Sequence, residues 1–453
     1  MELIKKYFFI RNFEDKENKY RMQKMDLPNE IIIIIQIKDE DINKEIYFLD
    51  NIDKEDNTNS DEDEEEEEES SDNGEFEEND DEEEEESEDI SEIVIKNEHN
   101  KLKEMNKLNT ELYIDNVKYN FQKYFKFTKT GVYQIKLKLN FLLEDCSYMF
   151  FNCDNIISID LSLFDSSKIL NMMFMFCGCT NLFHLNLSNF NTENVISMRS
   201  LFYGCKNLIN IDLSNFQTKN VTNMKSLFNG CKKLVNIDLS KFETKNVTEM
   251  RQMFYDCINL IEINLSSFNV ENVTSLESFF SGCKSLKFID LSNFNSKNVI
   301  DMSQMFYDCK SLKEIILSNF NTEKVTKMES MFSGCKNLNF LDLSKLNITN
   351  VFDMTQMFYK CKNLITIKLP KTKNIKIKNM ELMFYKCESL LYIDLSNYDI
   401  KNIKKIDDIF FGCINLTYIN LPSIDNIDLD FESIFCDCIN LIKKYNGIYT
   451  KKN

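Results

Sequence analysis

Apolar and polar residues follow one pattern that returns every 26 residues along most of the chain. The segment 205–230, CKNLINIDLSNFQTKNVTNMKSLFNG, is representative of this unit. In its first half Leu208, Ile211 and Leu213 are apolar, and the polar Asp212 separates the last two. This alternation predicts a short strand with one buried side.

The second half of the unit has a different period. Its apolar residues fall at i, i+3, i+6 and i+7, which places them on one stripe of a helix; they are Val221, Met224, Leu227 and Phe228. Thr222 is placed to cap this short helix, and Gly230 is placed to supply the left-handed residue that ends it. Each unit is therefore predicted to form a strand, a turn, a short helix and a tight turn.

One such unit cannot bury its own apolar edge, so neighbouring units must stack. The expected fold class is an α/β repeat solenoid of the leucine-rich-repeat type, with a parallel β-sheet on one face and short helices on the other. We assign eleven repeats to residues 153–440, a half-repeat cap to 127–152, and a C-terminal cap and tail to 441–453.

Twelve cysteines mark the register of the units. Each step between them is 26 residues except the last, which is 25; this cysteine ladder comprises Cys153, Cys179, Cys205, Cys231, Cys257, Cys283, Cys309, Cys335, Cys361, Cys387, Cys413 and Cys438. A column of identical inward positions favours small apolar side chains, and free cysteine is among the most buried residue types. We therefore interpret the ladder as buried, reduced, structural thiols.

A known family shares this unit. The string IDLSNF, followed by Thr, NVT, Met, Met-Phe or Leu-Phe, Gly and Cys, resembles the BspA-like leucine-rich repeats of bacterial and protist proteins. The resemblance covers about residues 127–445. It implies the solenoid fold and a role in adhesion or protein binding, and it implies no catalytic residue.

Residues 1–126 do not follow the repeat and are predicted to form a small β-rich domain that leads into the sheet. Five stretches have strand character; they are 31–37, 45–49, 111–114, 117–127 and 132–139. A disordered acidic insertion is expected at about 55–92, because such a segment cannot pack a core.

The acidity of the chain is confined to that insertion. Residues 61–89 hold 22 Asp and Glu and no Lys or Arg, so with a net charge of −20 for the whole chain the remainder carries +2. Several serines stand in or beside these acidic runs and are candidate phosphorylation sites for acidophilic kinases; they are Ser60, Ser70, Ser71 and Ser87.

Two residue columns on the predicted strands are candidate contact sites for a partner. One begins with Asp160 and Asp212; a calcium column would need several oxygens converging on each ion, so we interpret it as a solvated polar row. The other column turns aromatic toward the C-terminus, and exposed aromatics on a rigid sheet are typical of protein-binding surfaces. The partner-binding candidates are Phe288, Phe340, Tyr392, Tyr418, Asp290, Asp342 and Asp394.

Other kinds of site are not expected. A metal site needs converging Cys or His ligands, and the only histidines are His99 and His184. Disulfide pairing stays open for Cys177 with Cys179 and for Cys436 with Cys438, although the total of 15 cysteines is odd. We predict no cofactor, no catalytic residue and no nucleic-acid partner, because basic residues are scattered and there is no glycine-rich phosphate loop.

The remaining predictions concern function and location. NVT at Asn220, Asn246 and Asn272 would accept a glycan in a secreted protein, but these residues already have places in the repeat. No membrane span or ordinary signal peptide is apparent, so we expect a cytoplasmic or otherwise intracellular, monomeric solenoid. The predicted function is a non-enzymatic scaffold that binds a protein through its sheet face; the alternative is a secreted or cell-surface adhesin of the BspA-like type.

Overall fold

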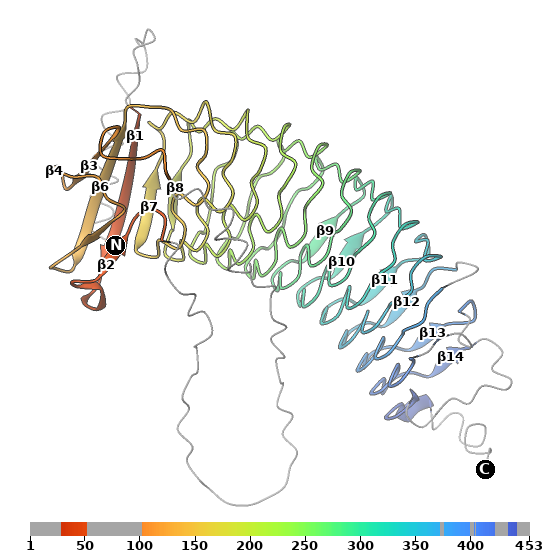
Figure 1. The fold of residues 1–453 in the computed structure, drawn as a ribbon. Coiled ribbons are helices and arrows are strands. Elements are labelled where there is room, and N and C mark those ends of the chain that lie inside the picture. The colour runs from red at the N-terminus through yellow and green to blue at the C-terminus, as the bar shows by residue number, and fades with distance from the viewer. Residues whose placement is uncertain are drawn as a thin grey trace, which may run out of the picture.

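The chain forms an arc of stacked coils that is closed at one end by antiparallel strands (Figure 1). This computed structural model describes residues 29–51, 102–371, 376–398, 403, 405–421 and 434–441. The acidic segment 61–89 and the four candidate phosphorylation serines lie outside the described residues. The solenoid predicted from the 26-residue period is confirmed.

The N-terminal end is a six-stranded sheet with the strand order β4-β3-β6-β1-β7-β8. Its antiparallel part consists of β1 (Glu30–Ile37), β3 (Thr110–Ile114), β4 (Val117–Tyr119) and β6 (Gly131–Leu139). A two-stranded sheet pairs β2 (Glu45–Tyr47) with β5 (Tyr124–Lys126). Strand formation is thus confirmed at all five predicted stretches, but the stretch 117–127 forms two separate strands, β4 and β5.

The antiparallel cap runs directly into the solenoid. β1 pairs antiparallel with β7 (Ile156–Asp160), and β7 pairs parallel with β8 (His184–Asn186), which belongs to the next coil. In β1, alternate residues are buried, among them Ile31, Ile33 and Ile35. The cap therefore continues the core of the first coils and covers the edge that the first coil would expose.

Short strands recur on one side of the coils, and in paired strands a residue lies beside its counterpart 26 positions later. They are β9 (Phe288–Asp290), β10 (Glu314–Ile316), β11 (Phe340–Asp342), β12 (Thr366–Lys368), β13 (Tyr392–Asp394) and β14 (Tyr418–Asn420). They form a two-stranded and a four-stranded parallel sheet, and no strand is assigned between β8 and β9 among the described residues. The parallel sheet is therefore present but interrupted.

The helices predicted on the other face are wrong. In the representative coil the segment from Lys225 to Gly230 is a series of turns, and Asn223 forms a parallel bridge to Glu249 of the next coil. Thr222 caps no helix; its backbone N–H donates to the carbonyl of Ile196 at 2.9 Å.

The hydrogen bonds explain why no helix forms. The N–H of Phe228 donates to Met253 of the next coil at 2.9 Å, and the N–H of Gly230 donates to Tyr255 at 2.8 Å. The same segment contains two left-handed residues, Ser226 at φ 56° and Gly230 at φ 71°. In an α-helix every residue has a negative φ of about −60°, and each N–H donates to the carbonyl four residues earlier. The left-handed residues and the hydrogen bonds to the next coil therefore exclude a helix here.

The interior is built from columns of identical residues. Phenylalanines of successive coils stack face to face, and Phe306 lies 5.8 Å from Phe280 and 5.5 Å from Phe332 between ring centroids. The predicted inward residues of the representative coil are buried although no helix carries them; they are Val221, Met224, Leu227 and Phe228. Each coil thus presents one apolar layer to the next.

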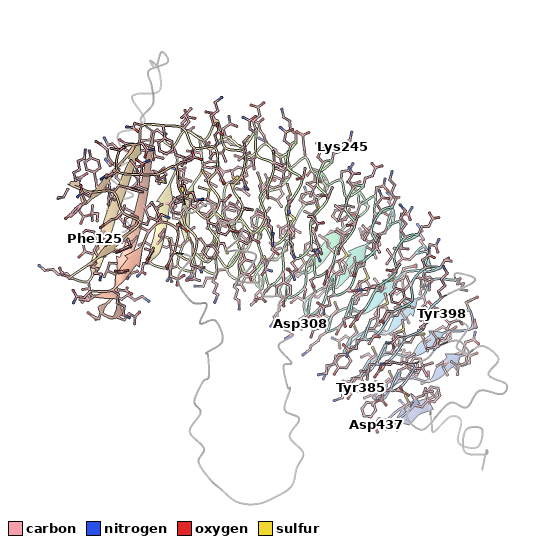
Figure 2. The ribbon with its side chains drawn as sticks, viewed as in Figure 1. Phe125, Lys245, Asp308, Tyr385, Tyr398 and Asp437 are labelled. Atoms are coloured by element: carbon pink, nitrogen blue, oxygen red, sulfur yellow. The ribbon has the colours of Figure 1, made fainter. Side chains whose placement is uncertain are left out.

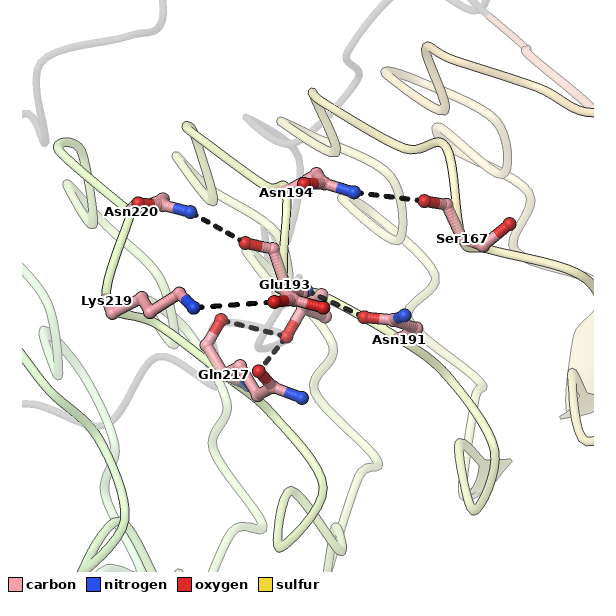
Figure 3. A network of polar contacts seen from close by, with 8 residues as sticks. Ser167, Asn191, Glu193, Asn194, Gln217, Lys219 and Asn220 are labelled. Atoms are coloured by element: carbon pink, nitrogen blue, oxygen red, sulfur yellow. Dashed lines mark hydrogen bonds and ion pairs between the residues drawn. The ribbon is translucent and has the colours of Figure 1, made fainter.

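Polar columns join the coils at the surface (Figure 3). The amide of Asn194 donates to the carbonyl of Ser167 at 3.0 Å, and that of Asn220 donates to the carbonyl of Glu193 at 2.8 Å. The buried Thr192 hydroxyl donates to the carbonyl of Gln217 and accepts from its N–H. Because each of these side chains bonds to the backbone of a neighbouring coil, the polar columns stabilise the stack.

Candidate interaction surface

The aromatic column predicted from the sequence lies exposed on the strands. Exposed fractions are 42% for Phe288, 48% for Phe340, 40% for Tyr392 and 43% for Tyr418. Each of them is the first residue of its strand, and the Tyr392 and Tyr418 rings stack 5.4 Å apart. The sheet holds the rings in register without burying them.

Aliphatic residues extend this column into a patch. Ile365 and Leu391 directly precede β12 and β13 and are 43% and 45% exposed. We call the group Phe340, Ile365, Leu391, Tyr392 and Tyr418 the aromatic patch. Single exposed apolar residues are ordinary on a protein surface, but a contiguous group on a rigid sheet is typical of an interaction site.

The aspartate column has a local structural role beside this patch. Asp342 accepts a hydrogen bond from the backbone N–H of Ser344 at 3.0 Å, and Asp394 accepts one from Ser396 at 3.0 Å. Asp290 accepts the equivalent bond from Ser292 at 2.8 Å. These are Asx turns that form one corner of each coil, a role that the sequence reading did not assign to them.

Charges next to the aromatic patch are held in place. Lys368 lies 3.0 Å from the Asp342 carboxylate and 5.5 Å from the centre of the Phe340 ring. Hydrogen bonds from Ser344 and from Lys368 lower the pKa of Asp342 to about 2. Asp342 therefore carries its negative charge at any physiological pH.

The cysteine ladder is enclosed by the coils. All fifteen cysteines are free thiols, and all but Cys436 are buried. Each ladder thiol has a backbone acceptor; the Sγ–H of Cys283, for example, donates to the carbonyl of Phe254 at 3.1 Å. Burial raises the pKa of Cys179 and of Cys361 to about 12. A thiol in this state is a poor nucleophile, since the thiolate is the reactive form.

Few groups suited to catalysis come together among the described residues. Ser158 and His184 lie on neighbouring strands with Oγ 3.2 Å from Nδ1, and burial lowers the pKa of His184. His99 lies outside the described residues. In the described ranges no group of three or more His, Cys, Asp or Glu side chains is arranged to hold a metal ion.

One feature of the surface was not predicted from the sequence. The residues two positions before the ladder cysteines include Tyr359, Tyr385 and Phe411, whose half-buried rings stack on consecutive coils. Figure 2 shows Tyr385 on the inner edge of the arc, on the side of Asp308 and Asp437, whereas Lys245 lies on the outer edge. The sequence contains the pattern that could have predicted this feature, because aromatic residues recur every 26 positions close to the ladder cysteines.

Comparison with known proteins assigns the repeats to a family. A family described as a Mycoplasma protein of unknown function, DUF285, matches residues 144–259, 231–339, 274–390 and 313–421, which together span more than half of the chain. The chain belongs to this family of repeat proteins. None of the curated proteins matches the chain.

Parts of two solved structures are also similar to the chain. The chain is 15% identical to a chain of the TLR13–ssRNA13 complex, with 56% of this chain and 49% of that chain covered and a TM-score of 0.22. An LRR protein of Leptospira interrogans is 14% identical over 56% of this chain and 85% of its own, with a TM-score of 0.18. The matched part thus spans about half the length of the TLR13 chain.

The described part of the chain contains no helix that is both long and apolar enough to cross a membrane.

Proposed function

We propose that this protein is a non-enzymatic scaffold that binds a protein partner through the aromatic patch of its sheet face. The exposed rings of Phe340, Tyr392 and Tyr418 on consecutive or alternate coils are the observation that carries the proposal. Aromatic residues supply much of the binding energy at protein interfaces, and here the sheet fixes them before binding. Ordering them on binding therefore costs little further conformational entropy.

Site-specific photo-crosslinking tests this function. A photoreactive phenylalanine analogue at position 392 should crosslink a partner protein in extract of the native cells. The same analogue at position 352, which is exposed on another column, is the matched control. Equal or absent crosslinking at the two positions would contradict the proposal.

Once the partner is known, alanine variants measure the contribution of each ring. Tyr392→Ala or Tyr418→Ala should each weaken binding by about 2 kcal/mol, or roughly 30-fold in Kd, if the ring is an anchor of the interface. Ser396→Ala removes a hydroxyl at a neighbouring corner and should change Kd by less than about twofold.

The compartment is a second part of the proposal. We place the protein inside the cell, because its fifteen free thiols suit a reducing compartment. Cell fractionation with thiol labelling after denaturation tests this, and full alkylation of a cytosolic protein is expected. Protease sensitivity on intact cells together with oxidised cysteines would instead favour the adhesin of the BspA-like type.

A further inference from the structure

The inner edge of the arc follows an alternating pattern on its middle coils, from Asn229–Gly230 to Ser333–Gly334. There, large and small residues alternate between coils at the two positions before each ladder cysteine. Tyr255–Asp256 is followed by Ser281–Gly282, and Tyr307–Asp308 is followed by Ser333–Gly334. A Cβ atom on Gly282 would lie 3.0 Å from Asp256 Oδ1, and Gly282 has φ 73°, so glycine fits closely beside the aspartate of the preceding coil.

This alternation stops after Gly334. Tyr359, Tyr385 and Phe411 then occupy three consecutive coils, with ring centroids 4.9 Å apart in both pairs and interplanar angles of 12° and 9°. Lys360 and Lys386 stand where other coils have glycine or aspartate, at φ 54° and 52°. Lysine is uncommon in the left-handed region of φ and ψ. The backbone conformation at these two positions therefore does not explain why lysine is present.

Lysines outnumber acidic residues around the ladder cysteines of this stretch, where Glu388 and Asp437 carry the opposite charge. The ammonium groups of Lys360 and Lys386 lie 5.2 Å and 5.8 Å from the centres of the Tyr359 and Tyr385 rings. Lys336 and Lys362 follow the ladder cysteines of neighbouring coils, and Lys362 pairs with Glu388 at 3.3 Å. We call Tyr359, Lys360, Tyr385, Lys386 and Phe411 the inner-edge cluster.

We infer that the inner-edge cluster binds an acidic peptide segment of the protein partner. This inference rests on the proposed function and adds a second contact to the aromatic patch. Because the rings stack on one another, their faces are largely occupied and their edges are left to meet a ligand. The edge of an aromatic ring is the positive end of its quadrupole, so ring edges and lysine ammonium groups both attract carboxylates.

The same geometry argues against single-stranded nucleic acid as the occupant. Proteins that bind it place bases on the open faces of aromatic rings. In the inner-edge cluster Tyr385 has a ring on each side, Tyr359 at 4.9 Å and Phe411 at 4.9 Å. A base therefore has no face of Tyr385 on which to stack.

Fluorescence anisotropy with a labelled decaglutamate peptide and the full-length chain tests the inference. Lys360→Gln with Lys386→Gln should weaken peptide binding by roughly tenfold, since each exposed ion pair contributes up to about 1 kcal/mol. Lys360→Arg with Lys386→Arg should keep the binding. The control, Lys241→Gln with Lys245→Gln, removes two exposed lysines from another part of the surface and should change Kd less than about twofold.

Three outcomes would overturn the inference. The first is equal peptide affinity of the wild type and the glutamine variant at both about 0.05 M and about 0.3 M NaCl. The second is lysine-dependent binding of an oligothymidylate in place of the peptide. The third is carbodiimide crosslinking of Lys360 or Lys386 to residues 61–89 of the same chain, which would make this chain's own acidic segment the occupant.

The two proposals fail separately. Tyr392→Ala with Tyr418→Ala removes rings of the aromatic patch and should leave decaglutamate binding unchanged. Loss of peptide binding in the inner-edge variants with intact partner crosslinking at position 392 supports both proposals. Unchanged peptide binding with intact crosslinking overturns only the inner-edge inference.

Discussion

Raising the pH should unfold the solenoid through its cysteine ladder. From Cys179 to Cys438, eleven ladder thiols are buried and have raised pKa values; burial is the largest cause in each case, and it brings Cys179, Cys361 and Cys438 to about 12. An exposed thiol in the unfolded chain titrates near pH 8.5. Between these values the unfolded chain loses protons that the folded chain keeps.

The sign and size of the effect follow from this difference. Because the pKa is raised in the folded state, the contribution of each thiol is complete below about pH 8.5 and is lost as the pH rises toward about 12. One pH unit above the unfolded value, ionisation stabilises the unfolded chain by about 1.4 kcal/mol per thiol. Eleven thiols together give about 15 kcal/mol, which matches the roughly 5–15 kcal/mol net stability of a typical domain.

Guanidinium unfolding followed by far-UV circular dichroism, with a reductant present, measures the effect between about pH 8 and pH 10. Lysine and tyrosine also titrate near the upper end, so a variant must isolate the thiols. Cys257→Ala with Cys309→Ala should reduce the slope of the unfolding free energy by about 2.7 kcal/mol per pH unit. Val273→Ala with Val299→Ala also removes buried atoms but keeps every thiol, and its slope should equal that of the wild type.

Two results would refute this reasoning. If the cysteine variant keeps the wild-type slope, the ladder thiols do not carry the pH dependence. If all fifteen thiols of the native protein react rapidly with a thiol reagent near pH 8, the ladder is accessible and its pKa values are not raised.

Three further predictions test the stack itself. Phe306→Ala should destabilise the protein by about 3–5 kcal/mol and speed hydrogen exchange in both neighbouring coils, whereas Phe306→Leu should cost less; equal effects would show that the ring packing is unimportant. Asn220→Ala removes a side-chain donor to Glu193 and should cost about 1 kcal/mol in urea unfolding, and no change would contradict a stabilising role for this column. Deletion of 55–92 should leave the melting temperature of the repeats nearly unchanged while weakening salt-sensitive associations; a fall of several degrees would make the segment part of the cap.

Burial in the repeats could be predicted from the sequence, but the backbone conformation could not. The spacing of Val221, Met224 and Leu227 fits a helical stripe, and the same residues do point inward. A coil with left-handed residues such as Ser226 also turns such side chains inward. What distinguishes the two is the partner of every second backbone N–H, which lies 25 residues away on the next coil, beyond any local pattern. A helix of two turns is also too short to form without tertiary packing. The helix propensity of these residues therefore did not determine the backbone conformation.

The candidate site was predictable in part for a related reason. Exposure of Phe340 and Tyr392 followed from the alternation within the strand, because the residue after each of them is buried. The hydrogen bond from Ser344 to Asp342 could have been expected from the Asp-x-Ser spacing at a strand end, which is typical of an Asx turn. The 26-residue period places Tyr359 beside Tyr385, but the face-to-face stacking of their rings at 4.9 Å needed the observed coil geometry.

In a solenoid of this kind, departures from a column carry more information about function than the columns do. A residue that recurs at every coil, such as the cysteine of the ladder, is explained by contact with its copies above and below. Tyr385 and Lys386 repeat Tyr359 and Lys360 of the preceding coil, whereas the alternation seen on the middle coils would place a serine and a glycine there. Phe340 and Tyr392 likewise replace the small polar residues that the earlier coils carry at the same strand position, such as Asn210 and Asn236. Since the stack tolerates polar residues at these places, the aromatic ones are not required by the core, and both departures lie on the C-terminal coils. Binding of a partner there is the physical role that these rings and charges fit.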